Sequence, residues 1–275
     1  MLEFKKYFND WKFIRSQKLE SVFDDYCMAL DYLGYDEKEC QKILRSIIKK
    51  FPESHIDAYN HMSISLRNQK KTQESLHYAL TAYLLGKSIM PTDFKHEQGI
   101  ISWSDLDNRP FLRSCQTLGL EFQYHKNFRR AIEIYTENLN YNPNDNQGIR
   151  YLLLDCYFQI DDFKNIQILF NQYPDDWSVE FLYGKVIFDV LRNNSKKVKE
   201  YWTNAYKCNK FVATEVIKNV HKKPEPFRLP GEPFFDAGIP VGSVQEAYDY
   251  WSRNKRVLGL RKIKNCFESL LKTIS

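Results

Sequence analysis

One stretch of the chain, residues 115–143, constrains the fold more than any other. Its first half carries residues at relative spacings of 0, 3, 4 and 7, which lie on one face of a helix: Cys115, Leu118, Gly119 and Phe122. Its second half places Ala131 and Tyr135 one helical turn apart and ends at Pro143. The small residues Gly119 and Ala131 allow two helices to approach closely, and the aromatic residues fill the space to a neighbouring pair. The stretch therefore predicts an antiparallel helical hairpin that stacks on others.

This pattern resembles the tetratricopeptide (TPR) repeat, W-x2-L-G-x2-Y…A-x3-F…P, with Cys115 in place of the tryptophan and with the Tyr and Phe positions exchanged. The resemblance covers about residues 55–210, because three weaker copies flank the unit. Their anchor positions are separated by 56, 35 and 30 residues: Ser63, Gly119, Leu154 and Gly184. The resemblance implies an all-α fold, an α-α superhelix (a TPR-like solenoid of antiparallel helix hairpins) with a C-terminal capping segment. The alternative is a set of unrelated helical hairpins.

Three shorter segments are similar to a group of bacterial TPR-like proteins: "WSDLDNRPFLR", "NPNDNQGIRYLL" and "GSVQEAYDYW". This second resemblance implies an architecture and no particular reaction.

Breaks in helical periodicity divide the chain into three predicted parts. Residues 1–54 are predicted to form N-terminal helices. Residues 55–222 hold the TPR-like repeats, which a long loop at 86–110 interrupts. Residues 223–275 hold a Pro-rich connection and C-terminal capping helices, since "KKPEPFRLPGEPFFDAGIP" has five prolines in nineteen residues. The final helix carries an apolar stripe that would close the last repeat: Leu260, Ile263, Phe267, Leu270, Leu271 and Ile274.

The first fifteen residues mix aromatic and basic side chains. Aromatic residues at positions 4, 7, 8 and 11 predict a helix. This helix either packs on its neighbour or serves as a membrane-surface or partner-binding arm. Helices are also predicted over about 18–33 and 36–50, the second starting at an Asp36/Glu39 capping box. Asp107 or Asn108 is expected to cap a helix that starts near Pro110.

The polar segment "NPNDNQG", residues 142–148, lies between two apolar runs. Asn and Asp side chains bond nearby backbone groups in turns and cap helix N-termini. One Asp and no Glu is too little carboxylate for a calcium loop. The segment is therefore predicted to be an inter-repeat turn and not a ligand loop.

The net charge is +5, but its distribution is uneven. From Arg253 onward, seven Lys/Arg accompany a single acid, Glu268, so the basic character belongs to the C-terminal tail. The six cysteines form no CxxC pair, which indicates reduced thiols. No apolar run approaches the ~20 residues of a membrane span, and the N-terminus lacks a signal-peptide core. These features predict a cytoplasmic protein.

Motifs of catalysis are missing from the sequence. There is no HExxH, GxGxxG, P-loop or GxSxG element. Adjacent acids such as Asp161 and Asp162 point apart on a helix, so they are expected to cap helices. The sequence therefore predicts a protein that is not an enzyme and that uses no cofactor or metal. An enzyme with its site in the 86–110 loop is the alternative.

The TPR resemblance implies a concave groove lined by the first helix of each hairpin. Its candidate partner-binding residues are Asn60, Ile64, Arg67, Asn68, Arg113, Gln116, Gln123, Tyr124, Tyr151, Asp155, Phe158, Phe181, Lys185 and Phe188. Because Arg and aromatic residues supply binding hot spots, the predicted function is a scaffold that binds a peptide or protein. Two alternatives stay open: the segment 223–275 fills the groove itself, or the basic tail binds nucleic acid, with Arg109, Arg113 and Arg150 contributing.

Overall fold

The computed structural model describes residues 2–8, 10–92, 94, 99–227 and 238–273. The chain divides into two compact units, Met1–Cys156 and Tyr157–Ser275, and each is described by itself. None of the described helices is both long and apolar enough to cross a bilayer.

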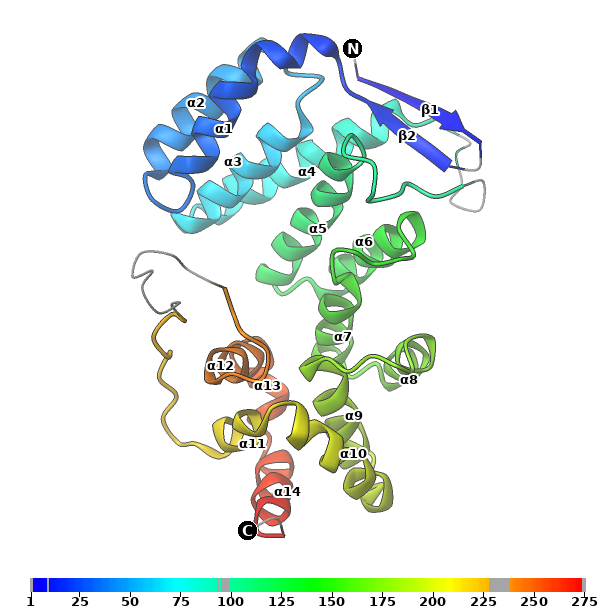
Figure 1. The fold of residues 1–275 in the computed structure, drawn as a ribbon, viewed down its shortest axis with the longest axis vertical. Helices are drawn as coiled ribbons and strands as arrows, with labels where there is room; N and C mark the ends of the chain where they lie inside the picture. The colour runs from blue at the N-terminus through cyan, green and yellow to red at the C-terminus, as the bar shows by residue number, and fades with distance from the viewer. Residues whose placement is uncertain (1, 9, 93, 95–98, 228–237, 274–275) are drawn as a thin grey trace. The chain divides into compact units, whose positions relative to one another are not determined.

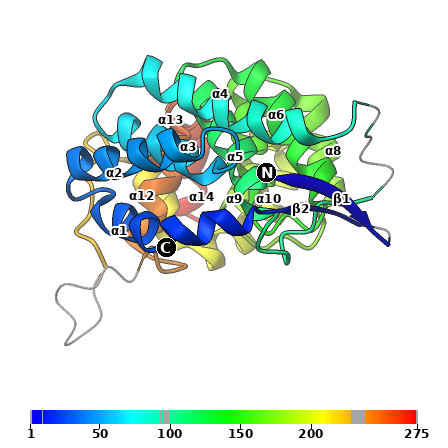
Figure 2. The same cartoon turned by 90° about the horizontal axis from the view of Figure 1, so that it is seen from above.

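The first unit begins with a β-hairpin where a helix was predicted. Strands β1 (Glu3–Tyr7) and β2 (Asp10–Ile14) pair antiparallel, with Phe4 opposite Phe13 (Figure 1 and Figure 2). The helix prediction for residues 1–15 is wrong because the chain offers β2 a distant backbone partner. The Trp11 amide donates to the Ile100 carbonyl at 2.8 Å, a contact that periodicity in a short aromatic run cannot reveal.

Helical hairpins make up the rest of the first unit (Figure 1). A 3-10 turn at Gln17–Val22 leads into α1 (Phe23–Tyr32), so the predicted 18–33 helix is α-helical only from Phe23 onward. The helices that follow are α2 (Glu37–Lys50), α3 (Ile56–Asn68), α4 (Thr72–Ile89), α5 (Arg109–Tyr124) and α6 (Phe128–Tyr141), and α7 (Ile149–Gln159) runs into the second unit. Helix α3 packs on both α4 and α5, as stacked hairpins require.

Capping explains most helix boundaries. The Asp36 carboxylate accepts from the Lys38 and Glu39 amides and starts α2 as predicted, although Glu39 itself pairs with Lys42. In the turn at 142–148 the buried Asp145 carboxylate accepts from the Ile149 amide at 2.6 Å and from the Arg150 amide at 3.1 Å. This confirms the predicted structural role of the turn.

The connection between α4 and α5 packs against the β-hairpin. Asn108 stands at the N-cap position of α5, but its side chain makes no capping bond there. Its Oδ1 instead accepts from the Phe13 amide at 2.8 Å, and its Nδ2 donates to the Trp11 and Ser102 carbonyls. The predicted side-chain cap by Asp107 or Asn108 is therefore wrong. The Asp107 carboxylate pairs with Arg15, and β2 engages the side-chain amide of Asn108.

The second unit continues with helical pairs and a C-terminal cap. Its helices are α8 (Phe163–Gln172), α9 (Val179–Leu191), α10 (Ser195–Cys208), α11 (Lys210–Ile217), α12 (Val244–Arg253), α13 (Lys255–Leu258) and α14 (Arg261–Leu271). Helix α14 packs on α9 and α11. The predicted apolar stripe is confirmed at Ile263, Phe267 and Leu270, which are buried, but not at Leu260, which precedes α14 and is 39% exposed. Ile274 lies outside the described residues.

The predicted hairpin core is confirmed at its tightest point. Gly119 on α5 lies against the ring of the fully buried Tyr135 on α6. A Cβ added at Gly119 would lie 2.2 Å from Tyr135 Cε1, well inside van der Waals contact. The two helices can therefore approach this closely only because residue 119 has no side chain.

We expect Gly119→Ala to lower the free energy of unfolding by about 1–3 kcal/mol, because overpacking at the ring outweighs the higher helix propensity of alanine. Urea unfolding would measure it. The double variant Gly119→Ala/Tyr135→Leu should lose less stability than the sum of the losses in the two single variants, since leucine leaves room for the methyl group. A single variant as stable as the natural chain would contradict this account of the packing.

Candidate functional site

The predicted groove residues of the first unit lie on α3, α5 and α7, and most of them are engaged within the unit. Asn60 is buried and its Nδ2 donates to the Asp57 carboxylate and the Pro110 carbonyl, each at 3.0 Å. Arg67 forms an ion pair of 3.1 Å with Glu121, whose side chain is fully buried. Asn68 is exposed and donates to Glu37 at 2.6 Å.

The remaining groove residues of this unit differ in exposure. Gln116 accepts from Gln147 at 3.0 Å, and Gln123 accepts from the Tyr135 hydroxyl at 2.8 Å. Tyr124 at the end of α5 is 53% exposed. On α7, Tyr151 lies beneath the Arg150 guanidinium, and Asp155 is buried. Ile64 on α3 is half-buried.

The groove residues of the second unit serve mainly as core. Phe158, Phe181 and Phe188 are buried, and Phe170 packs against both Phe181 and Phe188. Lys185 lies 6.0 Å from the centre of the Phe170 ring, and its Nζ donates to the Pro174 carbonyl at 3.3 Å. Burial lowers the pKa of Lys185. This set therefore offers less free surface than α3 and α5 do.

A buried ion pair of the first unit joins α3 to α5. The buried Asp57 carboxylate accepts two bonds from Arg113, one of them from Nε at 3.0 Å. Burial disfavours the charged carboxylate, but Arg113 outweighs this cost and holds the pKa of Asp57 below its ordinary value. Burial also disfavours the charged guanidinium, and Asp57 in turn raises the pKa of Arg113. Both groups are charged at neutral pH.

Two histidines flank this ion pair. The ring of His61 contacts the Asp57 carbonyl through Nδ1 at 2.8 Å, and Tyr26 lies 3.0 Å from the same nitrogen. His55 precedes α3, and its Nδ1 accepts from the Ala58 amide at 3.2 Å. The proton of neutral His55 is therefore on Nε2. Burial lowers the pKa of both rings, so both are uncharged at neutral pH.

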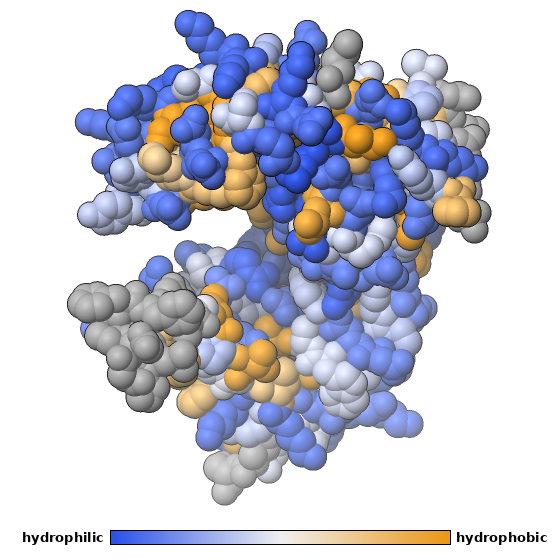
Figure 3. All heavy atoms as spheres, turned by 45° about the horizontal axis from the view of Figure 1, so that its top comes forward, coloured by the Kyte–Doolittle hydropathy of each residue, from blue (hydrophilic) through white to orange (hydrophobic). Residues whose placement is uncertain are grey.

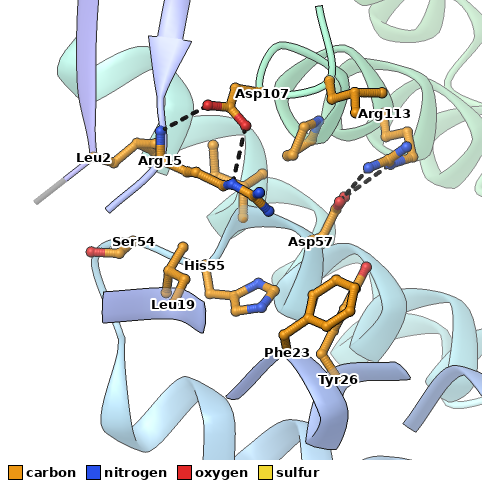
Figure 4. A pocket seen from close by; sticks show the side chains of 13 residues that line it. Leu2, Arg15, Leu19, Phe23, Tyr26, Ser54, His55, Asp57, Asp107 and Arg113 are labelled. Carbon is orange, nitrogen blue, oxygen red and sulfur yellow. Dashed lines mark hydrogen bonds and ion pairs between the residues drawn. The ribbon is translucent and has the colours of Figure 1, made fainter. Parts of the chain in front are cut away.

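A cavity of about 220 Å³ opens beside the ion pair (Figure 4). Its wall comes from the residues that flank the β-hairpin, the 3-10 turn with α1, the start of α3, the connection before α5, and α5 itself. It is lined by Leu2, Arg15, Leu19, Phe23, Tyr26, Ser54, His55, Ile56, Asp57, Leu106, Asp107, Pro110 and Arg113. Figure 4 shows Arg15 bonded to Asp107 on one side and Arg113 bonded to Asp57 on the other.

The sequence indicated Arg113 but missed Arg15, His55 and Asp57 as parts of one site. Arg15 lies in the segment predicted to be helical, so no sequence pattern placed it near α3. Asp57 is one helical turn before Asn60, a predicted groove residue, and that spacing was the available signal. The described residues contain no group of three His, Cys, Asp or Glu side chains placed to hold a metal ion.

The basic residues of the C-terminal tail bind within the second unit. Arg253 pairs with Glu180 at 2.6 Å and with Asp249 at 3.0 Å. Arg256 contacts the Phe158 carbonyl and Asp161. Two lysines donate to helix-end carbonyls: Lys262 to Leu191, and Lys264 to Lys218. These four side chains therefore fasten α12–α14 within the second unit.

Comparison with solved structures supports the architecture. A structure of nearly identical TPR-like repeats, from a Podosopora anserina protein assigned as a kinesin light chain, is similar with a TM-score of 0.52. The match covers 70% of this chain and 96% of that chain, at 9% identity. The chain has an all-α, TPR-like helical-repeat fold. A variant of the same protein gives a TM-score of 0.49 over 70% of this chain and 98% of that chain, at 8% identity. No family model and no curated protein matches the sequence.

For the TPR-like first unit we expect Asp57→Asn to reduce the free energy of unfolding by about 2–3 kcal/mol. This is somewhat less than the loss of a fully buried pair, because Arg113 reaches solvent. Urea unfolding of the two proteins measures this difference in the free energy of unfolding. The matched control Glu133→Gln removes an exposed partner of Arg130 and should cost less than about 1 kcal/mol. Equal losses in the two variants would contradict the importance of burial.

The same ion pair predicts a pH dependence. Because the folded state lowers the pKa of Asp57, its stabilisation is complete above the unfolded-state pKa of about 3.9. It declines as the pH falls from there through the lower folded-state pKa. Unfolding of the natural chain should therefore lose stability more steeply below pH ~4 than that of Asp57→Asn. Parallel pH profiles for the two proteins would contradict this assignment.

Proposed function

We propose that the chain is a non-enzymatic scaffold that binds a protein or peptide through the α3–α5 face. This surface is defined by Arg67, Asn68, Arg113, Gln116, Gln123 and Tyr124, and the buried Asn60 supports it from beneath. The TPR-like fold supports the proposal, because such repeats commonly serve as protein-interaction scaffolds and rarely bring catalytic groups together. Tyr151 and Asp155 extend the proposed surface onto α7. The remaining predicted groove residues, Phe158, Lys185 and Phe188, belong to the second unit and are not part of this proposed surface.

The observation that carries the proposal is the contrast between fixed and free side chains on this face. Arg67, Gln116 and Gln123 are held by partners inside the unit. Tyr124 stands 53% exposed at the end of α5. Side chains already held in place lose little entropy on binding, and an exposed tyrosine is a typical hot-spot residue. The face is therefore preorganised for a partner that covers Tyr124.

Nucleic-acid binding through the basic tail is the weaker candidate, because Arg253, Arg256, Lys262 and Lys264 already have partners in the second unit. It makes a distinct prediction, since phosphate contacts weaken steeply as salt rises.

The test is affinity capture from a lysate of the source organism at low and high salt, followed by mass spectrometry and a nucleic-acid stain. We expect a discrete protein that stays bound at high salt and is lost with Tyr124→Ala. The control Tyr35→Ala removes another exposed tyrosine, 88% exposed and outside the α3–α5 face, and should retain the protein. Capture of nucleic acid alone, released by salt and unaffected by Tyr124→Ala, would refute the scaffold proposal.

A further inference from the structure

The two strands of the β-hairpin differ in how their outer edges are covered. Strand β2 is engaged on both sides, because the Trp11 amide donates to the Ile100 carbonyl and the Phe13 amide donates to the Asn108 side chain. Strand β1 pairs with β2 alone within the described part of the chain, and Figure 1 shows it at the margin of the first unit. The outer edge of β1 is therefore where another strand could be added.

The bonds that β2 makes on its far side also fix which groups of β1 point outward. Opposed residues of an antiparallel pair alternate between those that exchange hydrogen bonds and those that do not. Trp11 and Phe13 direct their amides away from β1, so their opposed residues, Lys6 and Phe4, exchange no bonds with them. The amides and carbonyls of Phe4 and Lys6 therefore point to the outer edge. No described backbone group outside the hairpin bonds to either residue.

Charges of opposite sign lie two residues apart on one face of β1. Glu3 and Lys5 are both exposed, and they form an ion pair with each other along the strand. Exposed pairs of this kind contribute little, so both groups can also contact charges on an added strand. Lysine on an edge strand discourages pairing, and an acid placed opposite it removes this obstacle. The opposite face carries Phe4, which stacks on Trp11 with the ring centres 5.0 Å apart.

These charges make the edge complementary to itself in one register. Two copies of a strand that pair antiparallel about a two-fold axis place the axis at a residue, because opposed side chains share a face. An axis at Glu3, Lys5 or Lys6 would oppose two like charges, which is destabilising. An axis at Tyr7 would pair the turns and leave most of β1 without a partner. An axis at Phe4 places Glu3 opposite Lys5 of the second copy, and does so twice.

We propose that two copies of the chain associate through β1, with Phe4 on the two-fold axis. The Phe4 amide of each copy donates to the Phe4 carbonyl of the other, and a Glu3–Lys5 contact flanks this centre on either side. The two hairpins then form one four-stranded antiparallel sheet. This inference goes beyond the scaffold function and does not depend on the α3–α5 face.

The nature of this edge also predicts the strength of the contact. On the face that Figure 3 shows, apolar residues reach the surface as separate patches among hydrophilic ones. Backbone hydrogen bonds and charge pairing therefore hold the two copies together. One strand of five residues covers less than the ~1,200 Å² of a stable complex, so the dimer is expected to be transient.

Sedimentation velocity of the full chain over about 10 μM to 1 mM, the range of a transient contact, tests the proposal. We expect a concentration-dependent equilibrium between monomer and dimer. Glu3→Lys should raise the dissociation constant about tenfold, because two contacts between opposite charges become contacts between like charges. Glu3→Lys/Lys5→Glu should restore the natural value, since Phe4 on the axis keeps the exchanged charges opposite each other. The control Glu133→Lys makes the same change of charge at an exposed residue of α6 and should have no effect.

A backbone variant tests the hydrogen bonds of the same edge. Lys6→Pro removes an outward amide and no bond between β1 and β2, so the hairpin should remain and the dimer should be lost. Thermal unfolding checks that each variant is folded. A chain that stays monomeric over the whole range, or a dimer that persists in Glu3→Lys and Lys6→Pro, would overturn the proposal. A double charge variant that associates no better than Glu3→Lys would refute the register.

Discussion

The candidate site depends on one buried charge and its partner. Asp57 at the start of α3 is withdrawn from water, which is costly unless its charge is compensated. Arg113 supplies two bonds from α5, and Asn60 supplies a third from the same helix as Asp57. The three side chains thereby fix α3 against α5 in position and in rotation about their axes. The Asp57–Arg113 contact helps to set the geometry of both the α3–α5 face and the cavity, because Arg113 is part of both.

Much of the repeat architecture followed from local chemistry. Gly119 and Ala131 mark close helix approaches, Asp145 and Gly148 mark a turn, and the helices begin and end within a few residues of their predicted limits. These features can be predicted from the sequence because each depends on residues that are close together along the chain. The groove positions were likewise placed on the expected helices, but their exposure depends on which neighbouring helix offers a partner. Arg67 could not be matched to Glu121 from sequence alone.

The failures share a physical cause. Residues 1–15 have spacings compatible with a helix, yet the backbone of β2 is satisfied by Ile100 and Asn108, far away in sequence. The basic tail is a second case. Its excess of positive charge did not reveal that Arg253 pairs with Glu180 and Arg256 with Asp161. Both errors arise where a distant segment decides the environment of a local one. The cavity was missed for the same reason, because five segments must meet to form it.

The bond from the Phe13 amide to Asn108 also imposes an order on biosynthesis. It spans 95 residues, whereas α1–α2 and α3–α4 are hairpins of neighbouring segments. A ribosome adds about 5–20 residues per second, so β2 is synthesised roughly 5–20 seconds before its acceptor. During that interval the first two helical hairpins can fold, while the aromatic face of β1–β2 has nothing to cover it. The β1–β2 hairpin is thus among the last parts of the first unit to be secured, although it precedes the helical hairpins in the sequence.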